Sequence, residues 1–99
     1  MAEHCQTKRS TRRDEQYKQK LIHRLNRMEG QIRGLKKMVE EDAYCNDILV
    51  QSSAVRAALN AFNSQLVSQH LMHCVKNDLM NGDVGSAQEL AATLEKLLK

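Results

Sequence analysis

Proline is absent from this 99-residue chain, glycine occurs at only four positions, and only three residues are aromatic. Proline interrupts helix interiors and aromatic residues favour strands. Their scarcity, beside many Ala, Leu, Lys, Glu and Gln residues, therefore predicts an all-α fold. The length allows one small domain, and a helical chain of this size often completes its core by oligomerising.

Long apolar runs are also missing. The first 13 residues contain none, so we expect no signal peptide, and no stretch approaches the roughly 18 apolar residues of a membrane span. We therefore expect a cytoplasmic protein without a membrane partner. There is no Ser-His-Asp set, no carboxylate pair in an apolar setting and no phosphate-cradling glycine loop, so we expect neither an enzyme nor a small-molecule substrate.

Three cysteines are too few and too scattered for a disulfide framework. In a reducing compartment, metal binding or thiol chemistry is the better expectation. The alternative for any one of them is a buried, inert cysteine.

Positive charge is concentrated in the first third of the chain. Residues 1–37 hold eleven Lys and Arg and four acidic residues, a net charge of +7, whereas residues 38–99 carry a net charge of −4. This asymmetry favours a polyanionic partner, either nucleic acid or an anionic membrane, and the alternative is a solvated basic helix face. The polar stretch 1–13 has no periodicity and is predicted to be a mobile basic arm, which leaves a single helical domain over 14–99.

Three helices are predicted. From about 14 to 41, apolar residues recur at alternating spacings of four and three, as in helices that pack like a coiled coil. The segment 44–80 contains no glycine or proline and predicts one long helix, for which Asp42 is the expected N-terminal cap. A turn at 81–83 precedes a third helix over about 84–98. The stripe of the first helix comprises Leu21, Leu25, Met28, Ile32, Leu35 and Val39, and that of the second comprises Ile48, Ser52, Val55, Leu59, Phe62 and Leu66.

His70 and Cys74 are four residues apart on the long helix, so both side chains project from one face. Cys45 lies 25 residues before His70, roughly 37 Å away along the helix at 1.5 Å per residue. One chain therefore cannot bring the three together, but two antiparallel chains can, with a two-fold axis between Leu59 and Asn60. The expected architecture is a three-helix protomer in an antiparallel four-helix-bundle dimer, with two shared sites.

Two thiolates and one imidazole form a soft ligand set, which selects Cu(I) or Zn(II) over hard cations. Zn(II) usually takes four ligands, so three ligands favour Cu(I). A fourth ligand for zinc would have to come from His73, His4 or Cys5. The alternative for His70 and Cys74 alone is a chance pair at helical spacing.

A resemblance to a known family is carried by four stretches, Arg24–Gly34, Tyr44–Cys45, Asp47–Val55 and His70–Cys74. Over about residues 15–99 the chain resembles the CsoR/RcnR family of bacterial metal-sensing repressors. Its Cys…His-x-x-x-Cys set resembles the copper-sensing branch in particular. The nickel/cobalt and formaldehyde branches have a different ligand at the Cys74 position, and the persulfide-sensing branch lacks the histidine.

This resemblance implies a D2 homotetramer whose apo form binds operator DNA and represses copper efflux or chaperone genes. Cu(I) binding between protomers would release the DNA. The resemblance also implies that Tyr44 and Glu89 form hydrogen bonds around the ligand histidine, the match of Glu89 requiring a one-residue gap. DNA contacts would come from a diffuse basic face and the arm, at Arg24, Arg27, Arg33, Lys36, Lys37, Arg12 and Arg13, with Lys8 and Arg9 in addition.

Two alternative functions remain open. In a thiol-based repressor of the same fold, Cys45 and Cys74 would react with persulfide, and Cys5 would supply a further thiol. His70 counts against this alternative, because a thiol switch does not need that ligand. In a copper-buffering protein, the basic arm would bind no specific DNA.

Overall fold

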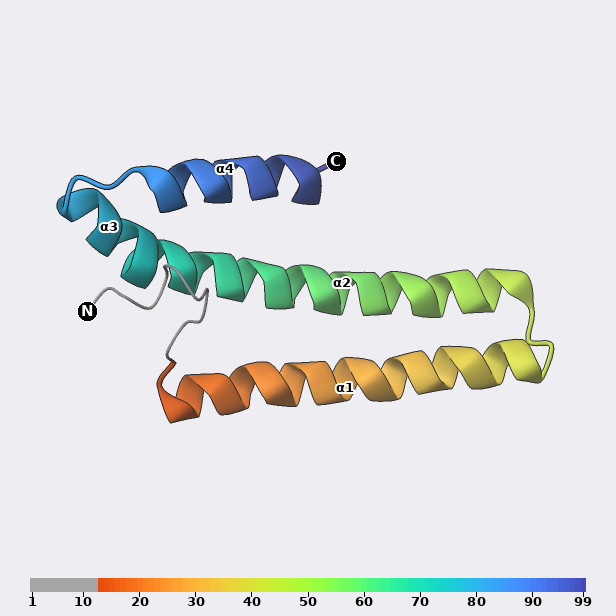
Figure 1. Cartoon of the computed structure of the whole chain (residues 1–99). Coiled ribbons are helices and arrows are strands. Elements are labelled where there is room, and N and C mark those ends of the chain that lie inside the picture. Colours follow the sequence, from red (N-terminus) through yellow and green to blue (C-terminus); the bar gives the residue numbers. More distant parts are fainter. Residues whose placement is uncertain (1–12) are drawn as a thin grey trace. The chain divides into compact units, whose positions relative to one another are not determined.

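The computed structural model describes residues 13–99 (Figure 1). These residues contain no strand, which confirms the all-α prediction. None of their helices is long and apolar enough to cross a membrane. The predicted arm of residues 1–13, with Arg12, His4 and Cys5, lies outside the described residues except for Arg13. The helical elements are α1 (Glu15–Glu40), α2 (Cys45–His70), the π-helical segment η2 (Leu71–Val75), α3 (Lys76–Met80) and α4 (Gly85–Leu97).

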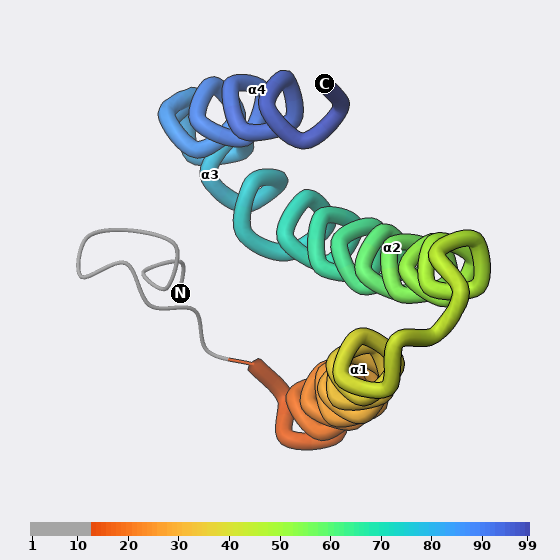
Figure 2. The backbone as a smooth tube through the Cα atoms, turned by 90° about the vertical axis from the view of Figure 1, so that its right-hand side faces the viewer, coloured from red at the N-terminus to blue at the C-terminus, as the bar shows by residue number. Residues whose placement is uncertain are grey.

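The described chain forms two compact units, residues 13–65 and 66–99. Within the first unit, α1 and the adjoining part of α2 run antiparallel side by side (Figures 1 and 2). The hydroxyl of Tyr17, in the first turn of α1, donates to the backbone carbonyl of Gln65 at 3.3 Å. Burial raises the pKa of Tyr17 above 10.0 although the charge of Arg13 opposes the shift, so the hydroxyl stays a donor at neutral pH.

The turn after α1 is closed by backbone hydrogen bonds. The Ala43 N–H donates to the Met38 carbonyl at 2.9 Å, and the Asp42 N–H donates to the Val39 carbonyl at 3.1 Å. These bonds form a Schellman motif in which Asp42, with a φ of 56°, takes the left-handed position. The prediction that Asp42 caps the second helix is therefore wrong, because Tyr44 precedes α2 and its carbonyl accepts the first backbone bonds of that helix.

The turn after α3 is a second Schellman motif, with glycine at the left-handed position. The Asp83 N–H donates to the Asp78 carbonyl at 2.8 Å, the Gly82 N–H donates to the Leu79 carbonyl at 3.0 Å, and Gly82 has a φ of 83°. The side chain of Asp83 then accepts the Gly85 N–H at 2.9 Å, where α4 begins. The predicted turn at 81–83 is confirmed.

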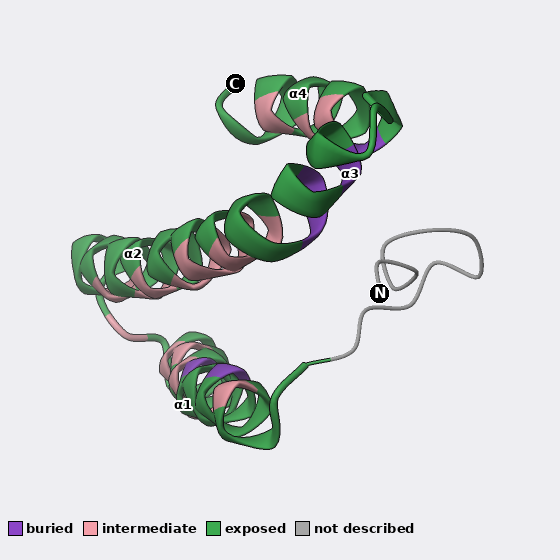
Figure 3. Ribbon diagram, turned by 90° about the vertical axis from the view of Figure 1, so that its left-hand side faces the viewer, coloured by how far each residue is buried: buried purple, intermediate pink, exposed green. Residues whose placement is uncertain are grey.

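Only every second residue of the predicted α1 stripe is buried within the chain. Leu21 and Met28 are buried and Leu35 is half-buried, at intervals of seven residues. Figure 3 shows the buried and intermediate parts of α1 along one side of the helix. The alternate row remains largely exposed and comprises Leu25, Ile32 and Val39. One chain therefore uses only one side of its coiled-coil pattern.

The inward row of α2 also differs from the predicted one. Ser52 and Leu59 are exposed. The residues that face α1 in the middle of α2 are instead the ones directly before them, Gln51 and Ala58. The inward row comprises Ile48, Gln51, Val55, Ala58 and Phe62. The apolar pattern placed Leu59 inside, whereas the packing uses the smaller Ala58.

The predicted long helix continues from Cys45 to Met80 with one interruption. In η2 the Lys76 N–H donates to the Leu71 carbonyl, a step of five residues instead of four. No glycine or proline marks this position, so the sequence did not reveal it. Such π-turns widen the helix locally and occur frequently at functional sites.

Candidate metal centre and nucleic-acid interface

The predicted metal ligands lie at the two ends of α2. Cys45 is its first residue and His70 its last, so 25 steps of 1.5 Å separate them by roughly 37 Å. Among residues 13–99 of one chain, no three His, Cys, Asp or Glu side chains gather into a metal-binding cluster. Within one chain, Cys45 therefore lies at the beginning of α2, whereas His70 and Cys74 lie at and just after its end.

His70 and Cys74 lie on either side of the first residues of η2. His70 is half-buried, whereas only 5% of Cys74 is exposed. A step of four residues is close to one full turn, so both ligands belong to the same side of the helix. His73, one of the three candidates for a fourth zinc ligand, is exposed, whereas Cys74 and Val75, the next two residues, are buried. His70 and Cys74, the two predicted ligands that lie close together in the sequence, thus lie at the π-helical turn.

The two residues predicted to surround the ligand histidine fall in different places. Tyr44 immediately precedes Cys45 and is 72% exposed. Glu89 is in the first half of α4, within the unit of residues 66–99 that also contains His70. Their roles around His70 stay predictions.

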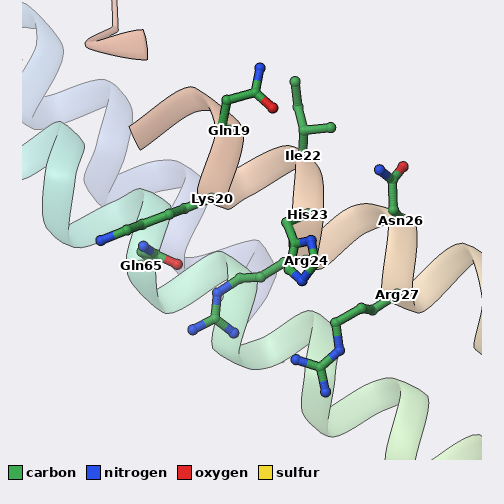
Figure 4. Close-up of a pocket in the computed structure, with 8 residues that line it drawn as sticks. All are labelled: Gln19, Lys20, Ile22, His23, Arg24, Asn26, Arg27 and Gln65. Atoms are coloured by element: carbon green, nitrogen blue, oxygen red, sulfur yellow. The ribbon is translucent and has the colours of Figure 1, made fainter. Parts of the chain in front are cut away.

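A row of cations lies on one face of α1. Lys20, Arg24 and Arg27 follow one another at spacings of four and three, and Figure 4 shows their side chains directed toward α2. Together with Gln65 of α2 they line an open hollow of about 670 Å³, which we call the basic hollow. Its other lining residues are Gln19, Ile22, His23 and Asn26. The lining contains no acidic residue, so an anion meets only attractive charge there.

A smaller hollow of about 200 Å³ adjoins the first. Arg24 and Arg27 line both, and the remaining lining residues here are Met28, Gln31 and Ala58. The side-chain oxygens of Gln31 and Gln65 are buried and have no hydrogen-bond partner within the described chain. Each hollow is thus lined by two guanidinium groups and by a glutamine whose side-chain oxygen is enclosed.

The remaining predicted DNA contacts do not line the basic hollow. The Arg33 guanidinium folds back toward Gly30, at 3.7 Å from where a β-carbon on that glycine would lie. The Lys37 ammonium is 3.9 Å from the Glu41 carboxylate. Lys36 is exposed on α1, and Arg13 precedes that helix. Of the predicted contacts that fall within residues 13–99, Arg24 and Arg27 line this hollow together.

Six of the eight residues that line the basic hollow were not predicted as DNA contacts, among them Lys20, His23 and Gln65. The spacing of Lys20 to Arg24 and Arg27 was visible in the sequence and could have identified it. His23 lies between these cations and offered a similar signal. Gln65 had none, because only the antiparallel packing of α1 on α2 brings it to this face.

Comparison with known proteins agrees with the family resemblance. The pattern of the family described as metal-sensitive transcriptional repressors matches residues 17–99. The copper-sensing transcriptional repressor CsoR of Bacillus subtilis (strain 168) is 40% identical over 100 aligned residues, which cover 100% of this chain and 99% of that protein.

Two solved structures resemble the chain. The copper-sensing repressor CsoR with Cu(I) from Geobacillus thermodenitrificans NG80-2 has a TM-score of 0.84 and 40% identity, covering 89% of this chain and 93% of that one. The nickel-responsive transcriptional regulator InrS has a TM-score of 0.62 and 40% identity, covering 80% and 86%. Because the family pattern spans most of the sequence, the chain belongs to the metal-sensitive transcriptional repressor family.

Proposed function

We propose that this chain is a cytoplasmic, Cu(I)-responsive transcriptional repressor. Its apo form binds operator DNA, and Cu(I) binding lowers that affinity, so that copper efflux or chaperone genes are expressed. The observation that carries this proposal is the donor set of Cys45, His70 and Cys74, two sulfurs and one imidazole nitrogen without a carboxylate. One copper-sensing and one nickel-responsive structure match the chain at the same 40% identity, so the choice of metal rests on these ligands.

The proposed site is shared between two protomers. Cys45 of one chain and His70 with Cys74 of the other would hold the ion, because the length of α2 keeps the two parts of the set apart in each chain. Bound Cu(I) would supply a link between the two protomers through thiolate sulfur. Tyr44 and Glu89 are proposed to fix the orientation of the His70 ring, which sets the nitrogen that faces the metal.

An antiparallel dimer, assembled further into a D2 tetramer, accounts for the exposed apolar surface. Among the described residues, fifteen large hydrophobic side chains are exposed while only four hydrophobic residues are buried. Such a chain buries too little apolar surface to be stable alone. The exposed residues Ala57 and Ala61 flank the midpoint between Cys45 and Cys74, where small side chains allow two α2 helices to cross closely.

Operator binding is assigned to the basic face of α1, centred on Arg24 and Arg27. Arg33, Lys36, Lys37 and Arg13 are proposed as additional phosphate contacts, and Arg12 falls in the segment that is not described. Contacts of this kind give affinity and a steep dependence on salt. A repressor with these properties needs no catalytic group and no small-molecule substrate.

The test is a DNA-binding measurement with and without Cu(I), on fully reduced protein under anaerobic conditions. The probe is a fluorescent duplex from the region upstream of the gene that encodes this chain. We expect salt-dependent binding by apo protein and weaker binding after one equivalent of Cu(I) per protomer. If persulfide abolishes binding while Cu(I) leaves it unchanged, the chain is a thiol-based repressor. If apo protein shows no salt-dependent binding, the chain is a copper-buffering protein.

A further inference from the structure

Gln65 is the residue through which α2 reaches the basic hollow. Its backbone carbonyl accepts the hydrogen bond from the Tyr17 hydroxyl at 3.3 Å, which holds this point of α2 against the beginning of α1. Its side-chain oxygen is enclosed and has no partner within residues 13–99. An enclosed acceptor without a donor is unfavourable, so a rearrangement of the neighbouring cations that gives it a donor is favoured.

The donors that line the hollow are the cations of α1. Figure 4 shows Lys20 and Arg24 extending toward the part of α2 that carries Gln65, and Arg27 extending toward α2 further along that helix; all four line the hollow. A guanidinium has five N–H donors, so it can hold a phosphate with two of them and still donate to an amide oxygen. The Gln65 amide nitrogen can donate to a phosphate oxygen in turn. A phosphate in the hollow would therefore order the cations and the amide together.

The dimensions of the row favour a DNA strand over a single free anion. From Lys20 to Arg27 the helix rises seven steps, about 10 Å at 1.5 Å per step. Successive phosphates of one DNA strand are spaced at about 3.4 Å along the duplex axis, so the row follows a short run of backbone. A hollow of about 670 Å³ with three cations and no acid in its lining accommodates such a run.

We propose that the basic hollow grips one run of operator backbone from two helices, with Lys20, Arg24 and Arg27 of α1 binding phosphates and Gln65 of α2 orienting them. This inference rests on the proposed DNA-binding function and deepens it. Lys20 becomes a phosphate contact, and Gln65 becomes a positioning residue. Because Gln65 precedes His70 by five residues on α2, the helix that carries a proposed metal ligand also takes part in holding DNA.

The experiment compares two charge changes in the hollow with two matched controls. Lys20→Gln is paired with Lys18→Gln, an exposed residue of α1 outside the hollow. Gln65→Glu is paired with Gln88→Glu, an exposed residue of α4. Affinity of reduced, metal-free full-length protein for the upstream duplex is measured by fluorescence anisotropy over a series of KCl concentrations. Circular dichroism and gel filtration verify that each variant keeps its fold and assembly.

We expect Lys20→Gln to weaken binding roughly tenfold and to lower the slope of log K against log salt by about 0.9, the loss of one phosphate contact. Gln65→Glu should weaken binding by more than about tenfold, since its carboxylate would pair with the cations and repel phosphate. Both controls should stay within about twofold. If Gln65→Glu fails to fold, Gln65→Leu replaces it, with an expected loss of roughly threefold to tenfold and unchanged net charge.

The outcomes separate this inference from the function on which it rests. If wild-type protein binds with a steep salt slope while the hollow variants behave like their controls, the DNA-binding function stands and the two-helix grip is wrong. If only Lys20→Gln departs from its control, Gln65 has no positioning role. If the wild-type protein binds no duplex at any salt concentration, both proposals fail.

Discussion

The shared metal site can be tested by mixing two defective chains. A Cys45→Ala chain keeps His70 and Cys74, and a His70→Ala/Cys74→Ala chain keeps Cys45. In α2 these two parts are 25 residues, roughly 37 Å, apart, so neither chain can repair its own site. A heterodimer with the proposed antiparallel geometry has one site with all three ligands and one with none.

The expected copper content follows from the symmetry. Equal amounts of two chains that exchange freely form about half heterodimers, each with one intact site. The mixture should therefore bind tightly about one quarter of a copper ion per protomer, against about one per protomer in the wild type and about zero in each variant alone. The assay is anaerobic competition with a chromophoric Cu(I) chelator, after unfolding and refolding the mixed, reduced chains so that protomers exchange.

Two results would contradict a metal site that is shared between protomers. Tight binding by either variant alone would show that three ligands from separate parts of α2 are not required. No recovery in the mixture, with heterodimers demonstrated by mass spectrometry, would show that the ligands do not meet across the proposed interface. A mixture of wild-type chains with chains that lack all three ligands serves as the control for exchange. Its heterodimers contain no complete site, so its copper content should fall below that of the wild-type chains alone by the number of sites lost to heterodimers.

Three further predictions concern the turns, the basic face and the metal. Asp42 and Gly82 both have positive φ, which favours glycine. Asp42→Gly should therefore raise the free energy of unfolding by about 0.5–1 kcal/mol, and Gly82→Ala should lower it by about 1 kcal/mol, in urea titrations at fixed protein concentration. Changes of the same sign in the two variants would contradict this. Arg24→Gln should lower the salt slope of DNA binding by about 0.9, and Lys37→Gln, whose ammonium already faces Glu41, should lower it less. His73→Ala should leave Cu(I) affinity unchanged in the chelator assay, since this side chain is exposed beside the buried Cys74; a large loss would make it a ligand.

The helices were predictable because their signals are local. The four-three spacing over α1 and the uninterrupted run after Tyr44 identified helices whose observed ends lie within about two residues of the prediction. The π-turn at Leu71–Val75 was not predictable, because no helix-breaking residue marks it. Asp42 was misplaced because a short carboxylate suits both an N-terminal cap and a left-handed turn, and only the backbone bonds of Ala43 decide between them.

The candidate site was only partly predictable, for a similar reason. The choice of Cys45, His70 and Cys74 as candidate ligands depends on residue type and helical rise, which the sequence gives directly, and it stays a prediction. The basic face was less well defined, since a count of cations does not say which of them share a surface. Packing of α1 on α2 selects Arg24 and Arg27, adds Lys20, and brings in Gln65 from a distant part of the sequence.

Three features of residues 13–99 each point to a different proposed partner. The exposed row of Leu25, Ile32 and Val39 requires apolar cover, which a second copy of the chain can supply. The proposed soft ligands would be joined by a metal shared between two protomers, and the Gln65 side-chain oxygen is enclosed without a donor among residues 13–99. Because α2 carries both His70 and Gln65, a metal-induced change in how two protomers hold α2 would alter the donors offered to DNA. On the proposed function, release of the operator then needs no large rearrangement, only a displacement of Gln65 relative to the cations of α1.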